Sequence, residues 1–167
     1  MLPKTGDLTD AQNYRPIAIL QIFYKIFSRM LYGRIRPLLD AQQSEEQTGF
    51  RAGIRIEDAL MIFETMASRC AEFQLPLWMA SLDLKKAFDR VEHFALFEAL
   101  RDQGLPEAEL AILLDLYWDQ TGSANGSRRF SILRGIKQGE RFSSLFFNVV
   151  IENVFWHWKD KLDEHGW

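Results

Sequence analysis

The sequence predicts a single α+β unit, because segments with a helical spacing of apolar residues alternate with short extended segments and turn-forming residues. The chain has 167 residues, of which 47% are hydrophobic, so it is long enough to bury a core of its own. No internal repeat, low-complexity tract or long linker interrupts it. We therefore expect one packed domain.

At the N-terminus we expect a two-stranded ribbon followed by a helix. Residues 2–4 and 14–20 are short and extended in character, and the Gly, Asp and Thr residues between them favour a turn. From Ile22 to Ile35, apolar residues recur at helical spacing, with basic residues on the outer side, until Pro37 ends the pattern.

The middle of the chain predicts a second helix and then a strand. Apolar residues from Ile56 to Cys70 follow a helical spacing that is typical of a helix facing a core. Pro76 then restarts the chain, and an apolar run from Leu77 to Ala80 predicts a buried strand that ends at Asp83.

The C-terminal half predicts helices and one hairpin. We expect helices over residues 94–102 and 107–118, the second beginning after Pro106. Residues 121–133, with Asn125-Gly126 in their middle, predict a β-hairpin. A last helix is expected from Ser143 onward.

Composition narrows the classes of protein. The formal net charge is -3 and the pI is about 5.6, so nucleic acid would have to be bound by local basic clusters rather than by overall charge. The single Cys70 has no partner for a disulfide or a zinc site, which suits a reducing compartment. No window approaches the roughly 20 apolar residues of a membrane span, so we expect an intracellular protein without a membrane partner.

The strongest candidate for chemistry is Asp83. A carboxylate at the end of a buried strand is a natural ligand for Mg²⁺, and the main-chain carbonyl of Leu84 is a second oxygen donor beside it. The same carboxylate could instead cap the helix that follows. The local pattern leaves both interpretations open.

Four motifs in order resemble the fingers and palm of reverse transcriptases of the non-LTR (LINE-like) retrotransposon class. They are Asn-Tyr-Arg-Pro-Ile at 13–17, Gln-Thr-Gly-Phe-Arg at 47–51, Leu-Asp-Leu-Lys-Lys-Ala-Phe-Asp at 82–89 and Arg-Gly-Ile-Lys-Gln-Gly at 134–139. Group II intron and other prokaryotic reverse transcriptases share the palm, but the first motif favours the LINE-like side. The resemblance implies an α+β fold that is an incomplete right hand over residues 1–167, with fingers about 1–75 and palm about 76–167.

The resemblance also implies roles for residues around Asp83. Asp83 would be the first catalytic carboxylate of a two-metal nucleotidyl transfer, binding Mg²⁺ together with the carbonyl of Leu84. Phe88 would lie under the nucleotide sugar and reject a 2′-hydroxyl, whereas a Phe in a helix is more often part of a core. Asp89 is interpreted as a helix-start residue or salt-bridge partner rather than a second metal ligand.

Further residues match substrate-binding positions of the same family. Lys4 and Arg15 correspond to the basic pair that folds over the triphosphate, where phosphate oxygens gather charge. Arg51 matches a position that contacts phosphate or template. Gln138 and Gly139 match the motif beneath the template strand and nucleotide, although a tight turn into a helix would also need Gly139.

The fourth motif departs from the family pattern Gln-Gly-Asp-Pro-x-Ser-Pro. Glu140 stands in the Asp position and both prolines are replaced, while Ser143, Phe147 and Asn148 keep the match. The basic residues around this motif could follow a template backbone or form a solvated face; they are Arg128, Arg129, Arg134, Lys137 and Arg141.

Two functional hypotheses follow. In the first, the chain is part of an RNA-directed DNA polymerase that uses an RNA template, a DNA primer, deoxynucleoside triphosphates and Mg²⁺, in the nucleus if the source is eukaryotic. In the second, it is a non-catalytic remnant that binds nucleic acid or a protein. Residues 1–167 contain no aromatic-Ala-Asp-Asp sequence. We therefore expect no primer extension by the isolated chain, together with exposed apolar surface and self-association.

Overall fold

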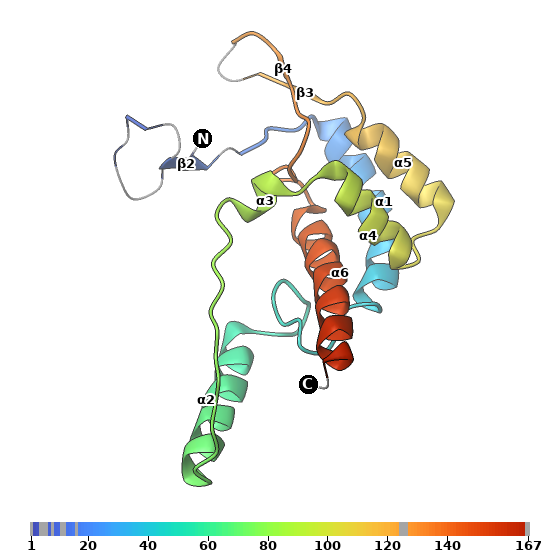
Figure 1. Ribbon diagram of the computed structural model, residues 1–167. Coiled ribbons are helices and arrows are strands. Elements are labelled where there is room, and N and C mark those ends of the chain that lie inside the picture. Colours follow the sequence, from blue (N-terminus) through green and yellow to red (C-terminus); the bar gives the residue numbers. More distant parts are fainter. Residues whose placement is uncertain are drawn as a thin grey trace.

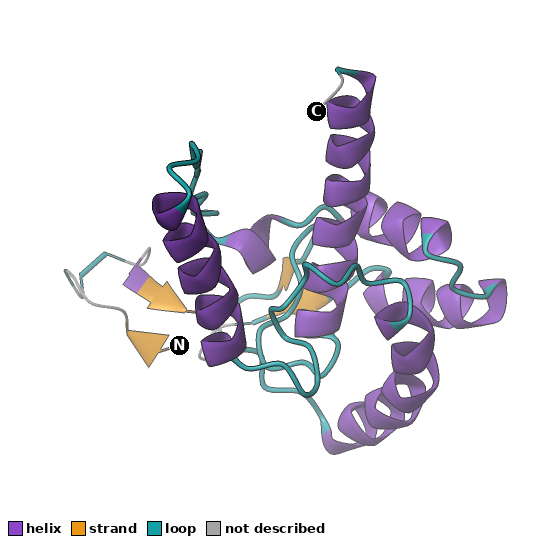
Figure 2. Ribbon diagram, turned by 90° about the horizontal axis from the view of Figure 1, so that it is seen from below, coloured by secondary structure: helices purple, strands orange, loops and turns teal. Residues whose placement is uncertain are grey.

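The computed structural model describes residues 2–3, 7, 9–10, 13–15, 17–123 and 127–165, and Figure 1 shows how they are arranged. Helices dominate, and the strands form two short ribbons, as Figure 2 also shows. The helices are α1 Ile22–Asp40, α2 Ile56–Glu72, α3 Ala87–Arg90, α4 His93–Asp102, α5 Glu107–Tyr117 and α6 Ser143–Glu164. The strands are β1 Leu2–Pro3, β2 Tyr14–Arg15, β3 Thr121–Gly122 and β4 Phe130–Ser131.

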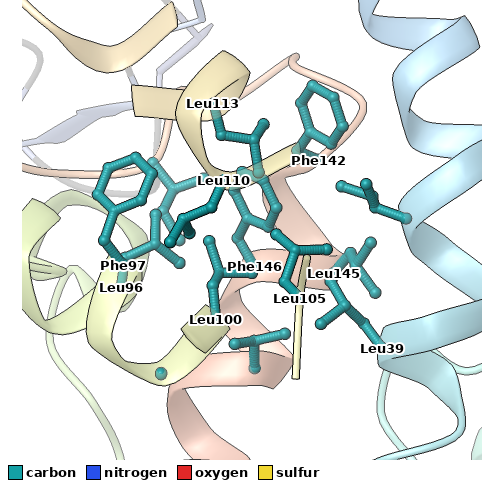
Figure 3. Packing of buried hydrophobic residues seen from close by; sticks show 14 of the residues in the cluster. Leu39, Leu96, Phe97, Leu100, Leu105, Leu110, Leu113, Phe142, Leu145 and Phe146 are labelled. Atoms are coloured by element: carbon teal, nitrogen blue, oxygen red, sulfur yellow. The ribbon is translucent and has the colours of Figure 1, made fainter. Parts of the chain in front are cut away.

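The core forms where α6 packs against α4, α5 and α1 (Figure 3). Phe142, Phe146 and Val149 are fully buried and recur at the spacing of one helix face. The rings of Phe142 and Phe146 are stacked, with centroids 5.0 Å apart. The same buried cluster includes Leu31, Ile35 and Leu39 of α1, Leu96, Phe97 and Leu100 of α4, and Leu110 and Leu113 of α5.

The sequence predicted that the first helix ends before Pro37. In the structure α1 instead continues through Pro37 to Asp40. Proline inside a helix costs about 3 kcal/mol because it has no N–H and its ring crowds the carbonyl four residues earlier. Ile35 and Leu39 lie on either side of Pro37 and are both fully buried. Their burial offsets the cost, since each buried aliphatic side chain contributes about 1.5–3 kcal/mol.

The prediction that α2 faces a core is wrong for the described part of the chain. The helix forms where predicted, and the Asp58 carboxylate accepts a hydrogen bond from the N–H of Arg55 (2.8 Å) at its start. None of its residues is buried, and Figure 1 shows it standing away from the other helices. Its apolar stripe, which includes Leu60 and Met66, therefore contacts solvent.

The predicted buried strand ending at Asp83 is also wrong. Residues 75–84 are irregular and exposed, with Trp78 92% and Leu82 88% accessible. An apolar run becomes a buried strand only when neighbouring strands take up its backbone hydrogen bonds and other elements cover it. Among the described residues, β1 pairs with β2 and β3 with β4, and neither ribbon pairs with residues 75–84.

Other predicted elements are confirmed. β1 and β2 are antiparallel, with Leu2 opposite Arg15, and β3 and β4 are antiparallel, with Thr121 opposite Ser131. The turn residues Asn125 and Gly126 lie outside the described residues. Helices α4, α5 and α6 begin within one residue of the predicted positions. No helix in the described ranges is both long and apolar enough to cross a membrane.

Replacing Phe146 by Ala should lower the free energy of unfolding by about 3–5 kcal/mol, because it removes a fully buried ring and leaves a cavity. Urea denaturation followed by circular dichroism measures the change. Phe94→Ala is the matched control, since Phe94 is 79% exposed. Equal effects of the two substitutions would contradict the proposed core.

The exposed stripe of α2 should make the isolated chain associate as its concentration rises. Introducing charge by Leu60→Lys and Met66→Lys should weaken association without lowering stability, because both side chains are more than half exposed. Sedimentation velocity over a concentration series measures this. Glu64→Lys on the same helix leaves the stripe intact and is the control. A wild-type chain that stays monomeric throughout the series would show that the stripe does not drive association.

Candidate functional site

The candidate site is built around the turn between β4 and α6. The N–H of Gly135 donates to the carbonyl of Val91 (2.7 Å), and the N–H of Ile136 donates to that of Phe88 (2.8 Å). Gly135 has φ +91°, and a Cβ there would lie 3.0 Å from the carbonyl oxygen of Asp89. Only glycine allows this close approach, so the turn is held against α3 and the residues just after it.

Gln138 and Gly139 contact two separate parts of the chain. The carbonyl of Gln138 accepts a hydrogen bond from the N–H of Ala18 (2.9 Å), just before α1, and its Nε2 donates to Oδ1 of Asp89 (3.0 Å) in α3. Gly139 has φ +98°, and a Cβ there would lie 3.2 Å from the carbonyl oxygen of Ala18. The turn therefore joins α3 to the segment before α1.

Phe88 belongs to an aromatic cluster next to this turn. Its ring stacks on Phe147 of α6, with centroids 4.5 Å apart and planes 24° apart. Phe50 meets it edge-on at 6.1 Å. Phe88 is only partly buried and packs against the edge of the core. The predicted substrate residues Phe88, Gln138 and Gly139 thus lie in one neighbourhood.

Arg51 helps to shape the loop that carries Phe50. Its Nη1 donates to the carbonyls of Ser44 (2.7 Å) and Gln47 (3.3 Å). From α6, Nδ2 of Asn148 donates to the carbonyl of Gly49 (2.8 Å), and Nε2 of Gln47 donates to Oδ1 of Asn148 (3.1 Å). These bonds hold the loop on α6, and contact of Arg51 with phosphate or template stays a prediction.

Glu140 is a functional candidate whose burial the sequence did not predict. The residue is 6% exposed, and its carboxylate accepts hydrogen bonds from the hydroxyls of Tyr24 in α1 and Tyr117 in α5, the latter at 3.3 Å. Burial raises its pKa to about 7. The only sequence signal was that Glu140 replaces the Asp of the family pattern.

Lys137 lies in the same turn as Glu140, and its ammonium group lies over the ring of Tyr24. Its Nζ is 5.4 Å from the centre of the Tyr24 ring, and burial lowers its pKa. The Tyr24 ring therefore has a cation on its face and a carboxylate at its hydroxyl. This arrangement anchors the turn to α1 by electrostatic contacts as well as by packing.

Asp83 and Leu84 lie on the exposed segment before α3. Among the residues that the structure describes, no group of three or more His, Cys, Asp or Glu could hold a metal ion. A two-metal site needs several carboxylates around ions a few Å apart. The described residues therefore do not form such a site by themselves.

The remaining basic candidates are dispersed. Lys4 lies outside the described residues, and of Arg15 only the backbone is described, in β2. Arg134 forms an ion pair with Glu92 (3.7 Å), and the Arg141 guanidinium lies 5.3 Å from the centre of the Tyr32 ring. The predicted basic neighbourhood is thus partly engaged in local contacts, while Arg128 and Arg129 are exposed.

A separate apolar cleft of about 520 Å³ lies between α4, α5 and β4. Its walls include Phe97, Tyr117, Trp118 and Ile132. None of the predicted site residues lines it, but Tyr117, which donates to Glu140, is shared by the cleft wall and the candidate site.

Comparison with known proteins shows the family of the chain. The family described as reverse transcriptase (RNA-dependent DNA polymerase) matches residues 2–165. The chain therefore belongs to the reverse transcriptase family. That family uses divalent metal ions and binds a nucleic-acid template and nucleotides.

The relatives place the chain among reverse transcriptases of non-LTR (LINE-like) retrotransposons. It is 28% identical over 159 residues to a Pol polyprotein from type-1 retrotransposable element R2 of Popillia japonica, covering 92% of this chain and 22% of that protein. It is 26% identical over 157 residues to the R2DM polyprotein of Drosophila melanogaster, covering 92% and 15%. It is 35% identical over 143 residues to a probable RNA-directed DNA polymerase from transposon X-element of the same fly, covering 83% and 13%. The chain thus corresponds to a part of a reverse transcriptase domain and spans less than a quarter of each of these relatives.

Glu140→Gln should remove a pH dependence of stability. The pKa of Glu140 is about 7 in the folded chain, against an ordinary 4.5, so between these values the folded state binds more protons than the unfolded state. The contribution of Glu140 to the free energy of unfolding is therefore fully present below pH 4.5. It is lost as the pH rises through 7, and the loss is on the order of 3 kcal/mol. The amide introduced by the substitution cannot ionise, so the variant should lack this slope.

Urea denaturation at pH 5, 6, 7 and 8 measures the difference between Glu140→Gln and wild type. Glu98→Gln, an exposed position on α4, is the control and should run parallel to wild type. If the Glu140→Gln and wild-type profiles were parallel, the carboxyl would not titrate differently in the folded and unfolded chains.

Proposed function

We propose that this chain supplies the nucleotide-binding part of an RNA-directed DNA polymerase that copies retrotransposon RNA from a DNA primer with deoxynucleoside triphosphates. The observation that carries the proposal is the hydrogen-bonded turn before α6. In this turn the N–H of Ile136 donates to the carbonyl of Phe88, and Gln138 donates to Asp89, the residue after Phe88. The family match over residues 2–165 supports the proposal.

Within this proposal, Phe88 contacts the sugar of the incoming nucleotide. Its ring is fixed by stacking on Phe147 and by the edge of Phe50, so it cannot easily yield to an added 2′-hydroxyl. Gln138 and Gly139 lie beneath the nucleotide and template. Lys4 and Arg15 contact the triphosphate, and Arg51 contacts phosphate or template; their assignment rests on the motif match.

Asp83 and the carbonyl of Leu84 are proposed as a contribution to a Mg²⁺ site. Carboxylate and carbonyl oxygens are the donors that Mg²⁺ prefers. One carboxylate does not hold two ions, so the contribution is incomplete without further ligands. What Asp83 itself offers is a solvent-exposed oxygen donor a few residues before Phe88.

We further propose that the fold is an incomplete right hand, with fingers about 1–75 and palm about 76–167, and that the protein acts in the nucleus of a eukaryotic source. The side chains of α1, in the fingers, share one core with α4, α5 and α6. The proposed fingers and palm therefore share one hydrophobic core where α1 packs with these helices.

A non-catalytic role in binding nucleic acid or a protein is the second candidate. It is favoured by the position of Asp83 on an exposed segment without a carboxylate cluster in the described ranges. The two candidates differ in one measurable property, because only the first requires selective recognition of deoxynucleoside triphosphates.

Equilibrium titration of the 167-residue chain with labelled dGTP and GTP tests the proposal. Wild type should bind dGTP more tightly than GTP. Phe88→Val should lower the ratio of the GTP to the dGTP dissociation constant about tenfold, because the smaller side chain admits a 2′-hydroxyl. Phe94→Val, at an exposed position, should leave it unchanged. Absence of binding, or equal affinity for both nucleotides in wild type, would favour the non-catalytic role.

A primer-extension assay with an RNA template, a DNA primer and Mg²⁺ accompanies this titration. We expect no incorporation by the isolated chain, because Asp83 has no carboxylate cluster around it in the described part. Template-dependent incorporation that disappears in Asp83→Ala would contradict this expectation.

A further inference from the structure

We propose that Asp89 is a positioning residue that fixes the side chain of Gln138 relative to the ring of Phe88. This inference rests on the proposed function, because it deepens the role of Gln138 at the nucleotide site. Sequence reasoning interpreted Asp89 as a helix-start residue or salt-bridge partner. In the structure Asp89 lies in the first turn of α3, as the helix-start interpretation expected, and none of the ion pairs among the described residues includes it.

The chemistry of the two groups decides how Gln138 is oriented. An ionised carboxylate only accepts hydrogen bonds, whereas a side-chain amide has one end that donates and one that accepts. The end of Gln138 that faces Asp89 must therefore be Nε2, which lies 3.0 Å from Oδ1. Asp89 thus excludes the flipped amide and leaves Oε1 and the second N–H for other contacts.

The backbone of the turn places the two residues opposite each other. The hydrogen bonds of Gly135 to Val91 and of Ile136 to Phe88 fix the register between the turn and α3. The carbonyl of Gln138 is held independently by the N–H of Ala18. With the backbone fixed at these points, the contact with Asp89 removes the remaining freedom of the amide.

This contact also couples the amide to the aromatic cluster. Asp89 directly follows Phe88, whose carbonyl accepts from the turn and whose ring stacks on Phe147. The sugar-contacting ring and the amide are thereby parts of one hydrogen-bonded piece. Loss of Asp89 should free the amide while leaving the ring in place.

Nuclear magnetic resonance of the ¹⁵N-labelled chain tests the contact without using any activity. Gln138→Ala identifies the side-chain NH₂ signals of Gln138 by their loss. In wild type these protons should exchange slowly with solvent, and Asp89→Ala should shift them and speed their exchange. Asp89→Asn, which keeps an acceptor oxygen, should restore part of the protection, and Asp160→Ala, at an exposed position, should change nothing. Unchanged signals in Asp89→Ala would overturn the inference.

Titration with labelled dGTP then tests the positioning role in a double-mutant cycle. Asp89→Ala should weaken binding about tenfold, of the order expected for a charge-assisted hydrogen bond, and should have no further effect in a Gln138→Ala background. Additive effects would mean that Asp89 does not act through Gln138 and would overturn the inference. Failure of wild type to bind dGTP, with the amide signals behaving as expected, would instead refute the proposed function and with it the purpose assigned to the contact.

Discussion

The burial of one apolar face, formed by Phe142, Phe146 and Val149, is the constraint on which the rest of the structure depends. Helices α1, α4 and α5 each contribute side chains to the buried cluster that covers this face, so the packing of the cluster sets where these helices lie. Phe142 is also the residue at which the turn enters α6. Fixing it places the preceding residues, including Gln138, against α3 and the segment before α1. The candidate site is therefore held by the core, although Phe88 and Gln138 are themselves only partly buried.

Glu140 shows how a polar group can serve this arrangement at a cost. Taking a carboxylate out of water is unfavourable, and the raised pKa expresses that penalty. Two phenol hydroxyls, from α1 and α5, compensate in part by donating hydrogen bonds. The same bonds connect the turn to two different helices. An apolar residue at this position could contact these helices only by packing, without directional hydrogen bonds.

The order of elements and the motif residues were predictable because each depends on local spacing. Helices α4, α5 and α6 begin where the apolar periodicity and Pro106 indicated, and both ribbons form where turn residues separate extended segments. The sequence also singled out Phe88, Gln138 and Gly139 before the structure showed them together. The extent of α1 past Pro37 was not predictable, since it depends on Ile35 and Leu39 meeting side chains from distant parts of the chain.

The sequence by itself therefore determined the family, the motif residues and most helices, because these follow from residue identity and spacing. Tertiary structure alone decided which apolar segments are covered: α2 has an apolar stripe and residues 75–84 form an apolar run, but none of these residues is buried. Burial requires a partner surface, and periodicity cannot show whether one is present. Tertiary structure alone also brought Asp89 to Gln138 and Glu140 to Tyr24 and Tyr117, because contacts between residues far apart in sequence depend on how the core packs.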